Sequence, residues 1–209
     1  MRKSLFVMIW VFVIELLTIV LLIPGNWTDK IIKKESVLIE QNLGTQTNEW
    51  IQNEASKWYQ SSIIESGVYD AMYDYLIPTE EQKNRSTGLE NMGKVWFKWV
   101  KQRLDAFFYV VYQFYTRFAL FLIWMPYICI LLIPAIYDGF MSWQVKRTNF
   151  DYVSPILHRY GTRGLLYVIG TLLIAFFSPI VLNPIIIPIS MMVCCMLIGV
   201  VLSNFQKRI

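Results

Sequence analysis

The chain has 209 residues, of which 56% are hydrophobic and only 16% are charged, and its mean hydropathy is +0.43. These values exclude an ordinary soluble domain and a disordered chain, and they indicate a membrane protein. The formal net charge is +4, and three cysteines and one histidine are too few for a cysteine and histidine metal cage or a disulfide framework. No metal or cofactor is expected.

The first predicted element is a membrane-spanning helix over residues 5–23. After a short basic N-terminus this stretch is apolar except for Glu15 and Thr18. At 1.5 Å per residue it is about 28 Å long, close to the thickness of the hydrocarbon layer. It is too long for the apolar part of a signal peptide, and residues 22–25 lack a small-x-small cleavage site. We therefore expect an uncleaved anchor over residues 1–24.

Residues 25–105 form a polar segment that holds 22 of the 34 charged residues. Between residues 48 and 76 apolar side chains recur at helical spacing, which predicts one helix there. A second helical pattern begins near residue 89, after a Thr-Gly-Leu-Glu sequence typical of a capping box. It continues without a breaker to residue 137, so residues 106–137 are expected to hold the second membrane crossing, over residues 118–137.

Residues 165–203 are predicted to form a hairpin of two further membrane helices. No Lys, Arg, Asp, Glu or His occurs between Gly164 and Phe205, and the pair Asn183-Pro184 divides this run into two stretches of about 18 residues. The expected fold is therefore all-α: a polytopic membrane protein with four transmembrane helices and a helical extracytoplasmic segment between helices 1 and 2.

The distribution of charge predicts the orientation in the membrane. The N-terminus, residues 138–164 and the tail at residues 204–209 together carry eight bases and two acids, whereas residues 25–105 carry ten bases and twelve acids. The positive-inside rule then places both termini and residues 138–164 in the cytoplasm. Residues 25–105 are expected outside, because the crossings that flank them require it.

An aromatic cluster marks the point where the long helix is expected to enter the membrane. Its members are Trp96, Trp99, Phe107, Phe108, Tyr109, Tyr112, Phe114 and Tyr115. This composition is typical of an interfacial aromatic belt, and it also suits a surface that docks a partner's membrane helix. The sequence leaves both interpretations open, with Trp96 and Trp99 as candidate partner contacts.

Two charged residues lie within the predicted crossings. Arg117 is at the outer edge of the second crossing, where its side chain could reach the headgroups as an anchor or contact a partner. Glu15 lies near the middle of the first crossing, too deep for either headgroup layer, so its carboxyl must be protonated, paired or turned toward protein. A helix-to-helix hydrogen bond, a partner contact and a proton relay all remain open for Glu15.

Residues 138–164 are predicted to form a cytoplasmic basic and aromatic loop. The candidate partner-binding residues in it are Asp138, Trp143, Lys146, Arg147, His158 and Arg159. Bases interleaved with aromatic rings can contact anionic lipid headgroups or a cytoplasmic protein. Direct binding of nucleic acid is not expected, because no fold for it surrounds these residues.

One family resemblance is carried by the order of residues in the second half of the chain. The residues that carry it are Arg117, Trp124-Met125-Pro126, Tyr137-Asp138-Gly139, Lys146-Arg147, His158, Ser178-Pro179 and Asn183-Pro184. This order resembles the integrating-conjugative-element membrane protein family, small bacterial inner-membrane proteins that are called TraJ-like in one group of mobile elements. The resemblance covers about residues 45–205 and is strongest over residues 117–184.

The resemblance implies a part in conjugative DNA transfer, since members of that family are encoded beside a coupling ATPase and a relaxase. Members carry a histidine pair after the tyrosine of the inner loop, whereas this chain has His158 followed by Arg159. That departure argues against a metal or catalytic role for the loop.

An enzyme is not expected, because the chain has no phosphate-binding Gly-x-x-x-x-Gly-Lys loop, no His-Glu-x-x-His pair and no Gly-x-Ser-x-Gly elbow. No small-molecule substrate is evident. The sequence therefore predicts an accessory inner-membrane subunit of a conjugative (type IV secretion) system that binds or stabilises the coupling ATPase. The alternative is a small transporter or a pore-forming membrane subunit.

Overall fold

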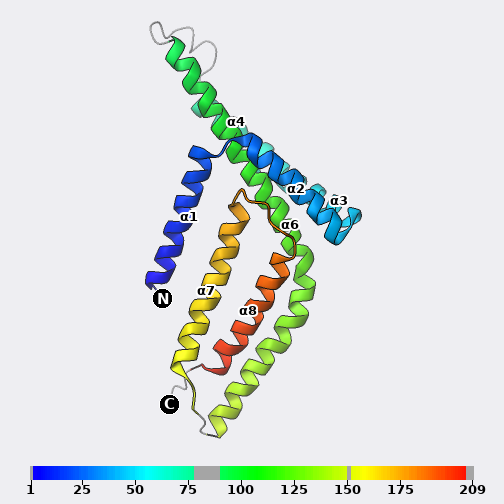
Figure 1. Cartoon of the computed structure of the whole chain (residues 1–209), viewed down its shortest axis with the longest axis vertical. Helices are drawn as coiled ribbons and strands as arrows, with labels where there is room; N and C mark the ends of the chain where they lie inside the picture. Colours follow the sequence, from blue (N-terminus) through cyan, green and yellow to red (C-terminus); the bar gives the residue numbers. More distant parts are fainter. Residues whose placement is uncertain (1, 78–89, 150–151, 206–209) are drawn as a thin grey trace. The chain divides into compact units, whose positions relative to one another are not determined.

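The structure is a computed structural model that describes residues 2–77, 90–149 and 152–205. All regular secondary structure in these residues is helical (Figure 1), as the sequence predicted. The elements are α1 (Arg2–Leu22), α2 (Gly25–Leu43), α3 (Thr45–Tyr59), a π-helical turn (Gln60–Ile64), α4 (Val68–Leu76), α6 (Glu90–Thr148), α7 (Pro155–Phe177) and α8 (Ile186–Ser203). Within the described ranges α1, α6, α7 and α8 are long and apolar enough to cross a membrane.

The four membrane helices agree with the predicted crossings, but α6 is longer than expected. It continues past residue 137 to Thr148, and α7 already begins at Pro155. Residues 138–148 and 155–164 of the expected loop are therefore helical, whereas residue 149 is a turn and residues 152–154 have no regular secondary structure. The helix continues because residues 138–148 contain no proline, and the only glycine, Gly139, packs closely against α8.

The segment between α1 and α6 also differs from the prediction. The helix expected over residues 48–76 is divided into α3, the π-helical turn and α4, and Gly67 makes the break with a left-handed φ of 74°. Helix α2 was not predicted. Its buried side recurs at helical spacing but mixes Thr28 and Glu35 with Ile31 and Ile39, so hydrophobic periodicity alone does not reveal it.

The chain divides into two compact units. Unit 1 comprises residues 1–13, 120–175 and 183–209, and unit 2 comprises residues 14–119 and 176–182. Helices α1, α6 and α7 each contribute residues to both units.

Unit 1 is a set of membrane helices that approach each other at glycines. A Cβ atom on Gly139 of α6 would lie 2.9 Å from the carbonyl oxygen of Gly199 on α8, and one on Gly161 of α7 would lie 2.9 Å from Val201. Small residues allow helix backbones to pack this closely, which is a common way for membrane helices to associate.

Unit 2 is built from the second part of α1, from α2, α3 and α4, from the first part of α6 and from residues 176–182. Helices α2 and α3 form a hairpin at Gly44, whose φ of 88° favours glycine, and hydrogen bonds join Ser36 to Asn48 across the pair. The buried apolar side chains are Ile19, Ile31, Ile39, Ile51, Ala55, Leu104, Ala106, Phe108, Val110, Ala119 and Phe176. The first part of α6 is thus enclosed by protein rather than by lipid alone.

Candidate functional site

A buried ion pair lies at the centre of unit 2. The Arg117 guanidinium on α6 donates to both carboxylate oxygens of Glu35 on α2, with Nη2 2.5 Å from Oε1 and Nε 3.3 Å from Oε2. The two side chains are only 1% and 4% exposed. Arg117 therefore does not extend toward a headgroup layer, as an anchoring arginine would.

The same two side chains hold the connection between α7 and α8. Arg117 donates from Nη1 to the carbonyls of Phe176 at 3.2 Å and Ser178 at 2.7 Å, and from Nη2 to that of Ile180 at 2.6 Å. Glu35 accepts from the backbone N–H of Leu182 at 2.7 Å. A buried charge is strongly unfavourable unless it is paired and hydrogen-bonded, and here both conditions are met. The network therefore fixes residues 176–182 against α2 and α6.

Glu15 lies beside this network. It lines a cavity of about 480 Å³ with residues of α1, the start of α2 and residues 178–180. Ser178 lines the same cavity, and the Oε2 atom of Glu15 is buried without a hydrogen-bond partner in the described chain. Glu15 thus lies among residues of unit 2, and the three roles left open for it by the sequence, a helix-to-helix hydrogen bond, a partner contact and a proton relay, remain predictions.

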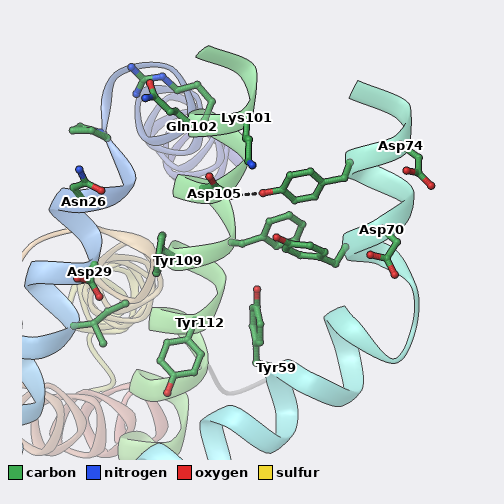
Figure 2. Close-up of a pocket in the computed structure, with 16 residues that line it drawn as sticks. Asn26, Asp29, Tyr59, Asp70, Asp74, Lys101, Gln102, Asp105, Tyr109 and Tyr112 are labelled. Atoms are coloured by element: carbon green, nitrogen blue, oxygen red, sulfur yellow. Dashed lines mark hydrogen bonds between the residues drawn. The ribbon is translucent and has the colours of Figure 1, made fainter. Parts of the chain in front are cut away.

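A larger groove opens between four helices of unit 2 (Figure 2). It measures about 1070 Å³, and its walls come from α2, from the end of α3 with α4, and from α6. Five tyrosines and four aspartates are among the residues that line it: Tyr59, Tyr69, Tyr73, Tyr109, Tyr112, Asp29, Asp70, Asp74 and Asp105. Of these residues, Tyr109 and Tyr112 belong to the aromatic cluster that the sequence predicts.

One side of the groove is fixed by aromatic packing and a hydrogen bond. Tyr69 packs on Phe108 of α6 with ring centroids 4.7 Å apart, and the Tyr73 hydroxyl donates to the Asp105 carboxylate. Burial, together with that hydrogen bond, raises the pKa of Tyr73 well above its usual range. The phenol therefore stays protonated at physiological pH and ties α4 to α6.

The aromatic cluster of α6 does not form a simple belt. Tyr112 donates to Gln52 of α3 at 3.0 Å, Tyr115 shares a hydrogen bond with Ser62 at 2.7 Å, and Phe108 meets the α4 tyrosines. Trp96 and Trp99 stack on each other at 5.2 Å, and Trp96 remains 59% exposed. Much of the cluster therefore covers an interface within the chain, an alternative to both interpretations drawn from sequence.

The candidate residues of the α6–α7 connection, all in unit 1, fall into two groups. Trp143 donates from Nε1 to the Phe205 carbonyl at 3.0 Å, Lys146 donates to the Ser203 carbonyl at 3.1 Å, and a ring nitrogen of His158 lies 3.1 Å from the Val201 carbonyl. These three side chains are anchored at the C-terminal end of α8. A cation there also complements the negative end of the helix dipole.

The second group projects from the surface. Arg147 and Arg159 are exposed, and Asp138 on the preceding turns of α6 is exposed as well. The Arg147 guanidinium lies over the Trp143 ring, 5.6 Å from its centroid. The structure thus brings Trp143, Lys146, Arg147 and His158 around one helix end. The spacing of Trp143, Lys146 and Arg147 predicts that these three share a helix face, whereas His158 joins them only through the fold.

The sequence pointed to only one of the two residues in the buried Arg117–Glu35 ion pair. Arg117 was a candidate, but Glu35 lies 82 residues away in a helix that periodicity did not indicate. A signal was available: Gln113 and Arg117 are one helical turn apart, and two long polar side chains on one face of an apolar helix call for a polar partner. In the described ranges no group of three or more His, Cys, Asp and Glu side chains could hold a metal ion.

Comparison with protein families identifies the chain. The family model described as "IncC plasmid conjugative DNA transfer protein DtrJ-like" matches residues 25–208. The chain belongs to this DtrJ-like family, and the predicted relationship to a conjugative-transfer membrane protein family is confirmed. No match was found among curated proteins or solved structures.

Proposed function

We propose that this member of the DtrJ-like family is an accessory inner-membrane subunit of the conjugative DNA-transfer machinery, without catalytic activity of its own. Family membership carries the proposal, because the family is one of conjugative DNA transfer proteins. Four helices long and apolar enough to cross a membrane, all within the described residues, support a multi-pass subunit.

The proposed contact is with the coupling ATPase of the system, through the face formed by the end of α6 and the start of α7. This face projects Arg147 and Arg159, with Tyr152, Ile156 and Tyr160 at 79%, 64% and 65% exposure. Arginine and tyrosine side chains are enriched at protein interfaces, where exposed charge also guides association. The excess of bases at this end favours the cytoplasmic side by the positive-inside rule.

The test variant must spare the side chains that are hydrogen-bonded at the end of α8, which are Trp143, Lys146 and His158. Reversing the charge of Lys146 would remove its hydrogen bonds to Ser203 and Asn204 at the end of α8. A loss of transfer could then come from a disturbed fold rather than from lost docking. The test variant is therefore Arg147→Glu with Arg159→Glu, which leaves Lys146, Trp143 and His158 intact. The matched control reverses two exposed bases of α2, Lys30→Glu with Lys34→Glu.

The double reversal of Arg147 and Arg159 is expected to reduce conjugative transfer at least tenfold while the protein stays at its normal level in the membrane. It is also expected to abolish co-purification with the coupling ATPase in mild detergent. If these arginines contacted only anionic lipid, the reversal would weaken membrane binding by about 1 kcal/mol per charge. The four membrane helices would still hold the protein in the membrane, so transfer would stay nearly normal. Normal transfer by this variant would contradict docking, and a wild-type protein that purifies only with copies of itself would favour a pore-forming subunit.

A further inference from the structure

We propose that the groove of unit 2 between α2, α3, α4 and α6 binds a neutral oligosaccharide. All the residues that line it belong to unit 2, whereas the face assigned to the coupling ATPase lies in unit 1. The inference therefore does not depend on that assignment. The positive-inside rule predicts that residues 25–105, which hold most of the groove, lie outside the inner membrane, on the side of the bacterial cell-wall glycan.

The four acids of the groove do not make it negatively charged. Asp29 on α2 is paired with Lys33 at 2.7 Å. Figure 2 shows that Asp70 and Asp74 lie on the side of α4 that points away from the groove. Asp105 on α6 is the acid that remains inside it (Figure 2).

Two bases lie along the same stretch of α6 as Asp105. Lys101 and Arg103 also line the groove, and Arg103 keeps its charge while it donates to the Ile23 carbonyl at 2.9 Å. Like charges that meet at a binding site are unfavourable. A cation would meet these two bases and an anion would meet Asp105, so a neutral ligand suits the groove best.

Aromatic rings line the groove in two groups. In the first, the rings of Tyr69 and Phe108 lie 4.7 Å apart, and those of Tyr73 and Phe108 are almost parallel at 6.2 Å. In the second, Tyr59 meets Tyr112 edge to face at 5.7 Å. Aromatic ring faces carry partial negative charge and attract C–H groups. Sugar rings present such C–H groups on their faces and hydroxyls at their edges, so they suit this lining.

Several polar side chains of the groove are free to bind a ligand. Asn26, Tyr59, Lys101, Gln102 and Tyr109 make no side-chain hydrogen bond within the described part of the chain. Amides and phenols both donate and accept, whereas the lysine only donates. A sugar hydroxyl also donates and accepts, so this mixture of groups matches a row of hydroxyls.

The walls of the groove favour a glycan over an extended peptide. They are formed by helices, whose backbone N–H and C=O groups bond within each helix, so these elements offer no strand edge for a peptide backbone. Recognition must then come from side chains. The volume of about 1070 Å³ slightly exceeds the usual range for drug-sized ligands, so the groove has room for more than one sugar ring.

Calorimetric titration of the purified full-length protein tests this proposal. The detergent is a polyoxyethylene ether, because the sugar headgroup of a maltoside would compete for the groove. The probes are three neutral tetrasaccharides, namely cellotetraose, maltotetraose and chitotetraose. Tetragalacturonate is the anionic comparison, and an oligoproline peptide tests for a peptide ligand, since aromatic grooves also bind proline-rich segments.

Two variants remove groups that face a ligand. Tyr109→Ala removes a ring that is 42% exposed, and Gln102→Ala removes a free amide. The matched controls are Tyr75→Ala on α4 and Gln41→Ala on α2, which change exposed residues outside the groove. Melting temperatures check that all variants fold. Tyr109→Phe keeps the ring and should retain most of the binding.

The wild-type protein is expected to bind at least one of the neutral tetrasaccharides, and to bind tetragalacturonate and oligoproline more weakly. Tyr109→Ala and Gln102→Ala should each bind that sugar about fivefold more weakly, whereas the two controls should bind as the wild type does. The proposal is overturned if all three sugars bind with a Kd above about 10 mM. Unchanged affinity in both groove variants would also overturn it, and tighter binding of oligoproline would assign the groove to a peptide instead.

Discussion

At the scale of single residues, Arg117 determines how unit 2 is organised. Its guanidinium pairs with Glu35 and is almost completely buried. Its remaining N–H groups donate to three backbone carbonyls of residues 176–180. Breaking a buried ion pair by removing one partner typically costs about 3–5 kcal/mol, because the other charge stays buried and unpaired.

Replacing Arg117 should therefore destabilise the protein far more than replacing an exposed base. We expect Arg117→Met to lower the free energy of unfolding by about 3 kcal/mol, whereas Lys34→Met on α2 should have little effect. Glu35→Gln should be intermediate, because its side chain still accepts from Leu182 and Arg117. Thermal unfolding in detergent, followed by tryptophan fluorescence, measures all three, and equal melting temperatures for the two methionine variants would contradict the role given to Arg117.

A second prediction at this scale concerns the glycines of unit 1. A Cβ atom on Gly139 would lie 2.9 Å from a backbone oxygen of α8, whereas one on Gly164 would meet only the flexible end of Leu197 at 3.5 Å. Gly139→Ala should therefore destabilise the protein, and Gly164→Ala should be neutral or stabilising, since alanine favours helix by about 1 kcal/mol. Melting temperatures of the two variants provide the comparison, and a stabilised Gly139→Ala would mean that α6 and α8 do not pack as described.

At the scale of elements, α4 is held to α6 by a tyrosine that must remain protonated. The pKa of Tyr73 is raised by burial and by donation to Asp105, since a phenolate there would be desolvated and would face a carboxylate. A group with a raised pKa contributes stability below its unfolded pKa, which is about 10 for tyrosine, and this contribution is lost as the pH rises through the folded pKa.

The docking of α4 should consequently be insensitive to pH between 7 and 9 and weaken above about pH 10. Tyr73→Phe should remove the part of this dependence that comes from Tyr73. Melting temperatures of the wild type and of Tyr73→Phe, measured from pH 7 to above about pH 10, test this prediction. The same alkaline loss in both proteins would assign it to other groups.

At the scale of the whole molecule, the arrangement of the chain across the membrane is the prediction on which the proposed contacts depend. The excess of bases at both termini and at residues 138–164 predicts that these lie in the cytoplasm and that residues 25–105 lie outside.

Cysteine labelling from each side of the membrane measures the orientation directly. Single cysteines replace the exposed residues Ser61 and Asn149 in a protein whose three native cysteines have been changed to alanine. A membrane-impermeant maleimide added outside should label position 61 and not position 149. The reverse pattern would place the Arg147 and Arg159 face outside and exclude a contact with a cytoplasmic ATPase.

The amino-acid sequence by itself determined the helical class, the four membrane helices, the break at Asn183-Pro184 and the relationship to conjugative-transfer proteins. These depend on composition, on the length of apolar runs and on local order, which a single chain displays directly.

Only the tertiary structure decided which polar residues are partners. Glu35 meets Arg117 across 82 positions, Asp105 meets Tyr73, and Lys146 caps α8 while Arg147 projects from the surface. Pairing over such separations depends on which helix faces pack together, and hydrophobic periodicity carries no information about polar residues on a buried face. For the same reason α2 was missed: two of the residues on its buried side are polar, and they are stable there only because of side chains from distant parts of the chain.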